Sequence, residues 1–245
     1  MAPARLGNQY DSPVVEPSTT DRDRRRELVH RALLSPRGRY GADRAAQLSG
    51  IPRSTLYEWQ RQAVYRPDFV RTKPMAWSYR DLIYLRLLAW MRSQRVERRY
   101  AADRVAEVRK ASIEGERIEQ VRTDGRSVLL NNETRNRSTG QDPFQDIEIL
   151  DLISAFDLLE PVEELGDRPL WGPDLVNPSE RSFISPWVMA GEPCVTDTRI
   201  PTSTLYALRV DRRLSTDRIV ALYPGVNGNA VDDAIALETR LRRAA

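Results

Sequence analysis

Residues 41–61, GADRAAQLSGIPRSTLYEWQR, carry the pattern of two short helices joined by a sharp turn. Ala46 and Leu56 fall where the two helices must pack closely, and Gly50 falls at the turn, where glycine tolerates a positive φ. Leu56 and Trp59 lie three residues apart and therefore share one face of the second helix. Its other face carries polar and basic side chains, namely Arg53, Ser54, Thr55, Tyr57, Glu58, Gln60 and Arg61.

That polar face has the chemistry of a nucleic-acid contact. Its side chains donate hydrogen bonds and carry positive charge, which suits phosphates and base edges. The pattern therefore predicts a DNA-binding helix-turn-helix. The alternative is an ordinary helical hairpin whose polar side faces only water.

Charge is divided unevenly along the chain. The whole sequence holds 38 Lys and Arg against 35 Asp and Glu, whereas residues 1–110 hold 23 against 12, a net charge of +11. The remaining residues hold 15 against 23, a net charge of −8. Such asymmetry indicates two surfaces with two kinds of partner, and the basic surface suits a polyanion such as DNA.

Residue types that carry much enzyme chemistry are scarce. The sequence has one cysteine, Cys194, and one histidine, His30, which excludes an internal disulfide and the usual structural zinc site. A Cys/His or Ser/His catalytic pair would need distant residues to converge, and no glycine-rich phosphate loop is present. The sequence therefore predicts no enzyme activity, no catalytic or metal-binding residue and no cofactor.

Hydropathy gives no sign of a membrane segment. The most apolar stretch, residues 82–91, contains Arg86, and the Pro-rich residues at the N-terminus lack the apolar core of a secretory signal. We expect a cytoplasmic protein without a membrane partner, which joins the nucleoid when it binds DNA.

Composition and turn signals divide the chain into five segments. We expect a disordered tail at 1–20, a DNA-binding domain at 21–112, a hairpin with an acidic connection at 113–165, a Pro-stiffened linker at 166–180 and a helical C-terminal domain at 181–245. The expected fold is mainly α with small β-hairpins, in the α+β class.

Further elements are predicted around the helix pair of the DNA-binding domain. A charged helix is predicted to begin after Thr20 and to run to Leu34, and residues 64–77 combine Pro, basic and aromatic residues at a length that suits a small wing. Ser78 and Asp81 form a capping pair before a helix that is apolar on most sides. We expect that helix in the core, with some part in a dimer contact, and another helix at 98–111.

The middle of the chain contains a hairpin signal and an acidic stretch. Residues 118–130 predict a hairpin with a type I′ turn at Asp124–Gly125. Residues 142–174 hold ten Asp or Glu, and a metal-dependent nuclease is one interpretation of Asp142, Asp146, Glu148, Asp151 and Asp157. We favour a helix with its apolar residues inward, because a helix spreads closely spaced carboxylates over different faces.

The C-terminal domain has a pattern of its own. Residues 182–201 predict two short strands separated by Gly191, and helices are expected at about 202–210, 215–223 and 231–243. A small helical core is expected from Ile219, Leu222, Val231, Ile235 and Leu237.

Residues 39–93, from YGADRAAQLSGIPRSTLYEWQR through SYRDLIYLRLLAWMRS, resemble the winged helix-turn-helix of the MerR family. The resemblance implies that Arg53, Ser54, Thr55 and Tyr57 lie at or near the major groove. It places Arg61, Arg66, Arg71 and Lys73 near the DNA backbone, and we add Arg44 of the first helix to the predicted DNA-binding set. The long dimerisation helix and the Cys-rich or ligand pocket of well-known MerR regulators are not evident in the sequence.

The C-terminal domain resembles that of a class of VapB-type antitoxins from VapBC toxin-antitoxin systems. The likeness lies in ISPWVMAGEP at 184–193, TDTRIPT at 196–202 and ALYPGVN at 221–227, with WGP at 171–173 before them. It implies a three-helix, homeodomain-like unit whose tail is similar to a helix-turn-helix.

Together the two resemblances imply an antitoxin that acts as a homodimer. It would neutralise a cognate PIN-like endoribonuclease toxin and would bind operator DNA to repress its own operon. Arg199 is the candidate that pairs with the toxin's carboxylates. The alternative is a stand-alone MerR-like transcriptional regulator with a C-terminal dimerisation or effector domain.

Overall fold

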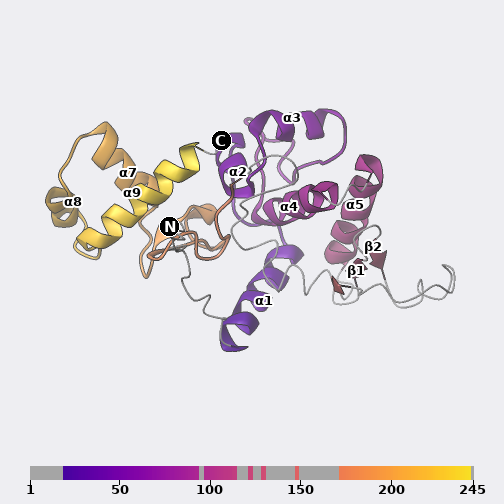
Figure 1. Ribbon diagram of the computed structural model, residues 1–245, viewed down its shortest axis with the longest axis horizontal. Coiled ribbons are helices and arrows are strands. Elements are labelled where there is room, and N and C mark those ends of the chain that lie inside the picture. The colour runs from indigo at the N-terminus through magenta and orange to yellow at the C-terminus, as the bar shows by residue number, and fades with distance from the viewer. Residues whose placement is uncertain are drawn as a thin grey trace, which may run out of the picture.

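The computed structural model describes residues 19–93, 97–114, 121–123, 128–130, 147–148 and 171–243. This part of the chain is mainly helical with small antiparallel strands, which confirms the expected class (Figure 1). The helices of the first half are α1 (Thr19–Leu34), α2 (Ala42–Ser49), α3 (Arg53–Arg61), α4 (Tyr79–Ser93) and α5 (Arg98–Glu114). The predicted disordered tail, apart from its last two residues, lies outside the described residues.

Helices α2 and α3 form the predicted pair, and the turn between them has the predicted cause. Gly50 adopts φ 74° and its N–H donates to the carbonyl of Ala46 at 2.9 Å, which closes α2 in the left-handed conformation that favours glycine. Ala46 and Leu56 are both buried, as the sequence predicts, and so is Trp59. The apolar side of α3 therefore packs into the core and fixes which side faces outward.

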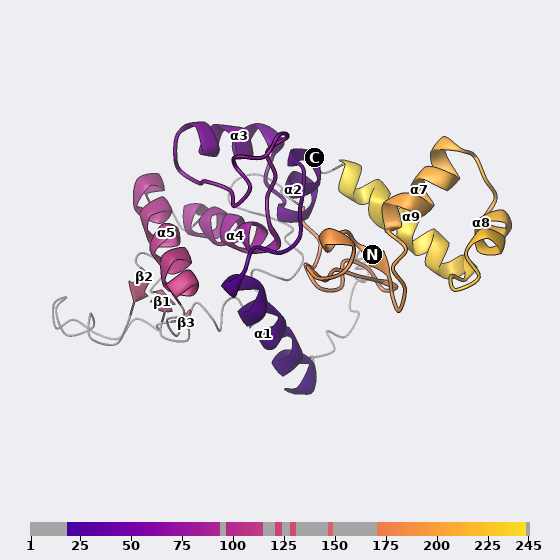
Figure 2. The same ribbon diagram turned by 180° about the vertical axis from the view of Figure 1, so that it is seen from behind.

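Helix α4 lies at the centre of the molecule and is buried on nearly all sides, which confirms the expected core position (Figure 1). Its start is the predicted capping pair: the N–H of Ser78 donates to Asp81 Oδ2 at 2.7 Å, and the N–H of Asp81 donates to Ser78 Oγ at 3.1 Å. Helix α5 and the C-terminal helices lie on opposite sides of α4 (Figure 2). A dimer contact by α4 stays a prediction.

The described part of the predicted linker, residues 171–180, packs on the N-terminal core instead of spanning open solvent. Leu175 is fully buried, and its carbonyl accepts from the Tyr79 hydroxyl at 2.8 Å. The buried guanidinium of Arg86 donates to the carbonyl of Pro173 at 2.6 Å, and Asp174 pairs with the buried Arg25. Buried donors on α1 and α4 therefore fix this segment to the core.

A small sheet confirms the predicted hairpin and corrects its neighbour. Strands β1 (Val121–Thr123) and β2 (Val128–Leu130) pair antiparallel, with Thr123 opposite Val128. Strand β3 (Ile147–Glu148) adds to β1, so the helix expected here is wrong for these two residues. The predicted turn at 124–125 and the carboxylates at 142, 146, 151 and 157 lie outside the described residues.

The C-terminal unit contains the two predicted strands and the three predicted helical segments. The strands β4 (Ser182–Phe183) and β5 (Cys194–Val195) pair antiparallel, and the short helix η3 (Met189–Gly191) lies between them. The helical segments are α7 (Thr202–Tyr206), which continues into the π-helical turn η4 (Ala207–Asp211), then α8 (Thr216–Leu222) and α9 (Gly228–Arg243). At the start of α8, Ser215 Oγ accepts from the N–H of Arg218 at 3.3 Å.

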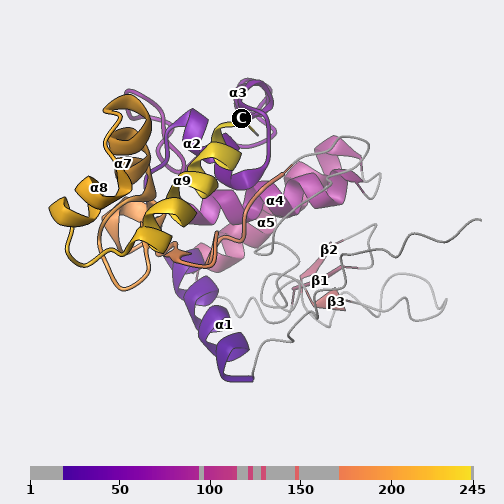
Figure 3. The ribbon, with the colours of Figure 1, turned by 60° about the vertical axis from the view of Figure 1, so that its left-hand side comes forward.

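Helix α9 belongs to two cores at once. Ile219 and Val231 are buried in a small core with the other C-terminal helices, as predicted. The prediction that Leu222 belongs to this core is wrong, because its side chain is 50% exposed. Leu237 and Leu241 pack instead into the large core built around α4. The last turns of α9 lie beside α2 in two views (Figures 1 and 3), so the C-terminal unit is continuous with the N-terminal one.

Gly191 marks another close contact between the units. The Tyr40 hydroxyl donates to the carbonyl of Gly191 at 2.9 Å, and a Cβ at Gly191 would lie 2.0 Å from that hydroxyl oxygen. Gly191 also has φ 87°, so both its backbone conformation and its neighbour require glycine.

Candidate nucleic-acid interface

The outward face of α3 presents the side chains predicted to contact DNA. Arg53, Ser54, Tyr57 and Arg61 are exposed and Thr55 is half-buried, while Leu56 and Trp59 hold the opposite face in the core. Because α3 is only nine residues long, those two anchors define its orientation. The result is a short amphipathic helix with its donors directed away from the protein.

Aromatic packing orders the start of this face. The Tyr57 ring meets the buried Trp77 ring edge to face, with 6.0 Å between their centroids. The Arg53 guanidinium lies 5.7 Å from the centroid of the Tyr57 ring and donates to Asp43 Oδ1 at 2.9 Å. Arg53 and Asp43 are more than half exposed, so this ion pair is weak and a phosphate can replace the carboxylate.

The loop after α3 carries the other predicted basic contacts. The side chains of Arg66, Arg71 and Lys73 are all exposed. A bridge between Phe69 and Ala76 closes the loop on itself, and a second bridge pairs Trp77 with Tyr40. The loop has the length of the predicted wing, although its pairing is limited to single bridges.

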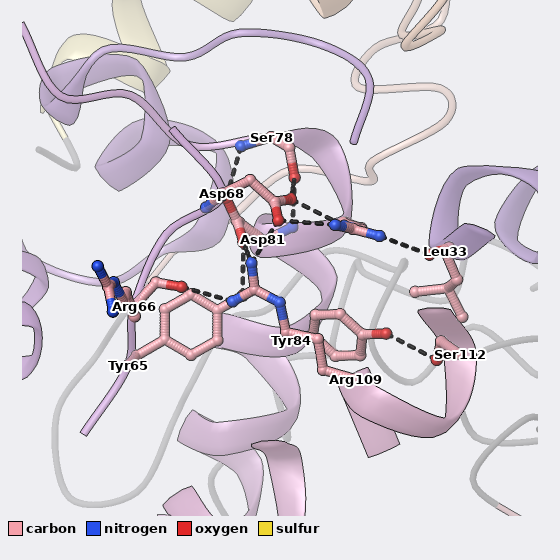
Figure 4. A network of polar contacts seen from close by, with 10 residues as sticks. Leu33, Tyr65, Arg66, Asp68, Ser78, Asp81, Tyr84, Arg109 and Ser112 are labelled. Carbon is pink, nitrogen blue, oxygen red and sulfur yellow. Dashed lines mark hydrogen bonds and ion pairs between the residues drawn. The ribbon is translucent and has the colours of Figure 1, made fainter. Parts of the chain in front are cut away.

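A buried polar network holds the base of this loop (Figure 4). Arg80 donates to both oxygens of Asp68, at 2.8 and 2.7 Å, and Ser78 Oγ donates to Asp68 at 2.5 Å. Burial by itself would raise the pKa of Asp68, but these hydrogen bonds and the charges of Arg109 and Arg80 outweigh it and lower that pKa. Asp68 is therefore an ionised anchor that joins the loop to α4 and α5.

Asp81 is the second anchor of the same network. Its carboxylate accepts from the Tyr65 hydroxyl at 2.7 Å, from the N–H of Asp68 at 2.9 Å and from the N–H of Ser78 (Figure 4). Burial and the neighbouring Asp68 raise the pKa of Asp81 to about 6, although Arg109 opposes the shift. The network therefore fixes the base of the loop to α4 and α5.

Arg44 does not belong to this surface, and we remove it from the predicted DNA-binding set. Its guanidinium donates to both oxygens of Glu238, at 3.1 and 3.0 Å, and to Glu192 at 3.0 Å. The Arg44 side chain is 13% exposed and that of Glu238 is 1% exposed. Both carboxylates come from the C-terminal unit, so this arginine joins the two halves of the chain instead of meeting a phosphate.

Arg199, the predicted toxin contact, lies exposed on the turn that follows β5. The turn is held by Thr198, whose hydroxyl donates to the carbonyl of Val195 at 2.8 Å and accepts from the N–H of Ile200 at 3.1 Å. Arg199 therefore belongs to the C-terminal unit, whereas the outward face of α3 belongs to the N-terminal one.

Sequence reasoning missed Arg242. It lines an open groove of about 650 Å³ together with Asp43, Gln47, Pro52, Arg53 and Ser54. The sequence shows a basic run at the end of α9, namely Arg240, Arg242 and Arg243. Nothing in the local pattern places that run beside the start of α3.

Two observations concern possible metal and thiol chemistry in the described residues. Within them, no group of three His, Cys, Asp or Glu side chains is placed to hold a metal ion. Burial and the nearby Glu192 raise the pKa of the Cys194 thiol to about 11, so the thiol stays protonated and donates to the carbonyl of Glu192 at 3.3 Å.

Across the described part of the chain, no helix is long and apolar enough to cross a bilayer.

Comparison with known proteins adds one likeness. Residues 184–237 match a protein family described as of unknown function, DUF433. The match covers β5, α7 and α8 and most of α9, and it ends before the basic last turn of α9. No curated protein and no solved structure matched the chain.

Proposed function

We propose that the protein binds operator DNA through α3, in the manner of a MerR-like winged helix-turn-helix. Arg53, Ser54, Thr55 and Tyr57 read base edges in the major groove, and Arg61 contacts the backbone. The observation that carries the proposal is that Leu56 and Trp59 bury one face of α3 and leave this donor-rich face exposed.

The loop at 66–77 acts as the wing in this proposal. Arg66, Arg71 and Lys73 are exposed on it, and the Asp68 and Asp81 network fixes its base to α4 and α5. Phosphate contacts from such a loop set the register in which the helix reads bases. A homodimer would place two copies of α3 on half-sites about 10 bp apart or a multiple of it.

The test is fluorescence anisotropy with a labelled duplex from directly upstream of the coding sequence and with a duplex of random sequence. The Arg53→Ala/Arg61→Ala variant is expected to bind the upstream duplex at least about 30-fold more weakly, since two arginine contacts of about 1–3 kcal/mol each amount to at least about 2 kcal/mol. The matched control is Arg212→Ala/Arg218→Ala, which removes two exposed arginines of α8 and of the segment just before it. Helix α8 lies far from α3 (Figure 1). Unchanged affinity in the Arg53/Arg61 variant overturns the assignment of α3.

We further propose that the C-terminal unit neutralises a PIN-like ribonuclease toxin and that DNA binding represses the operon that encodes both proteins. The supporting observation is that Arg199 projects from an ordered turn in the TDTRIPT segment that resembles VapB-type antitoxins. A guanidinium there can pair with the carboxylates of a nuclease cleft and exclude RNA.

The full chain is the right reagent for this second test, because Leu237 and Leu241 of α9 need the core around α4. The protein encoded by the neighbouring reading frame is co-expressed with the wild type or with Arg199→Ala. We expect growth arrest to be relieved by the wild type and much less by Arg199→Ala, while Arg218→Ala protects fully. If the neighbouring protein is not toxic and does not co-purify, the stand-alone regulator replaces the antitoxin.

A further inference from the structure

The end of α9 lies where an extended DNA contact would need it. The last turns of α9 lie beside α2 (Figure 3). Glu238, one turn before the end of α9, is fixed to α2 by Arg44, and Arg242 follows four residues later. Arg242 lines the same open groove as Arg53 and Ser54 at the start of α3. Two segments far apart in the sequence therefore share one basic surface.

Arg242 is ordered without being neutralised. Its guanidinium lies 4.4 Å from the centroid of the Tyr206 ring, and its Nε is 4.0 Å from Glu238, whose carboxylate is already engaged by Arg44 and Thr202. The Arg242 side chain is 49% exposed. An arginine that is stacked and half exposed keeps its donors directed outward at a low entropy cost.

The balance of charge around the groove favours an anion. Arg53 and Arg242 line it against the single carboxylate of Asp43, and the exposed Arg243 lies next along α9. We infer that the last turn of α9, through Arg242 and Arg243, binds backbone phosphates of the same duplex that α3 reads. This inference rests on the proposed DNA binding and extends it to the C-terminal unit.

The rigid junction makes this contact effective. Because Arg44, Glu238 and Leu241 fix α9 to α2 and to the large core, the phosphate contacts of α9 and the base contacts of α3 form together. Little further ordering of the protein is then required on binding. The loss of conformational entropy therefore offsets little of the favourable free energy that counterion release gives each phosphate contact.

The test measures the affinity of the full-length Arg242→Gln/Arg243→Gln variant for the random-sequence duplex over a series of salt concentrations. The slope of log K against log salt is negative, and its magnitude should shrink by about 0.9 for each phosphate that the variant no longer neutralises. We therefore expect a slope that is shallower by about 1 to 2 for the double variant. The control is Arg212→Gln/Arg218→Gln, which should keep the wild-type slope. Arg242→Lys/Arg243→Lys should restore it, and circular dichroism checks that each variant stays folded.

The outcomes separate this inference from the function on which it rests. If neither duplex binds the wild type, the proposed DNA binding fails and this inference fails with it. If the wild type binds and Arg53→Ala/Arg61→Ala weakens binding while Arg242→Gln/Arg243→Gln keeps the wild-type slope, only the role of α9 is overturned.

Discussion

Arg44 and Arg53 belong to one helix pair, yet the structure gives them opposite environments. Arg44 on α2 is enclosed by Glu192 and Glu238 and has a side chain only 13% exposed. Arg53 on α3 is 56% exposed and meets only the exposed Asp43 and the face of Tyr57. The comparison teaches that a basic residue of this helix pair becomes a buried structural contact or stays exposed according to the groups that distant segments place around it.

The largest expected effect is on the enclosed arginine. Arg44→Ala leaves the carboxylate of Glu238 buried without its main cation, so the free energy of unfolding should fall by about 3–5 kcal/mol. Urea denaturation followed by circular dichroism measures it, with Arg44→Ala/Glu238→Gln as the companion variant that recovers part of the stability. A decrease below about 1 kcal/mol would show that the junction does not hold the two units.

The apolar side of the same junction comes next. Leu241 is fully buried in the large core, so Leu241→Ala should lower the free energy of unfolding by about 2–4 kcal/mol. Leu222→Ala is the matched control, because that leucine is half exposed on α8 and should change stability by less than about 0.5 kcal/mol. Equal effects of the two substitutions would contradict the placement of α9 in the N-terminal core.

A third prediction extends the comparison to the buried acids at the base of the loop. Because the pKa of Asp81 is raised to about 6, the folded state binds the proton more tightly than the unfolded state. The contribution of Asp81 to the free energy of unfolding therefore falls as the pH rises from about 4 to about 6. Over this pH range, the free energy of unfolding of the wild type should therefore fall by about 2 kcal/mol more than that of Asp81→Asn, which has no carboxyl to titrate at this position.

Denaturation at a series of pH values measures this difference between the two proteins. Asp43→Asn, a substitution of an exposed aspartate in the same unit, serves as the control and should follow the wild type. Parallel curves for Asp81→Asn and the wild type would remove Asp81 as the titrating group.

The smallest effect on stability is expected at the exposed arginine. The pair of Arg53 with Asp43 is solvent-screened, so Arg53→Ala should change the free energy of unfolding by less than about 1 kcal/mol. The same variant should nevertheless weaken DNA binding. If Arg53→Ala destabilises the protein as much as Arg44→Ala does, the contrast between the two arginines fails.

Local signals in the sequence were sufficient for much of the fold. A glycine at the α2 turn, the Ser78 and Asp81 capping pair and the β1–β2 hairpin all depend on residues within one or two turns of chain. The buried face of α3 also follows from spacing, because Leu56 and Trp59 repeat with the helical period. The buried positions of Leu56 and Trp59 define the exposed face of the candidate site.

Long-range packing accounts for what the sequence did not predict. Arg44 and Glu238 are 194 residues apart, and Tyr79 and Leu175 are 96 apart, so no window of sequence contains both partners. The exposure of Leu222 has the same origin, since its spacing suits a buried position but the helices around it leave that side open.

The sequence by itself determined a short amphipathic helix with arginines and hydroxyls on its outer face, because steric and hydrogen-bonding preferences act over a few residues. Only the tertiary structure decided which of the surrounding charges stay available. It buried Arg44 against two carboxylates and brought Arg242 to the edge of α3, because the energy of a charge depends on the solvent and the counter-charges that the whole fold places around it.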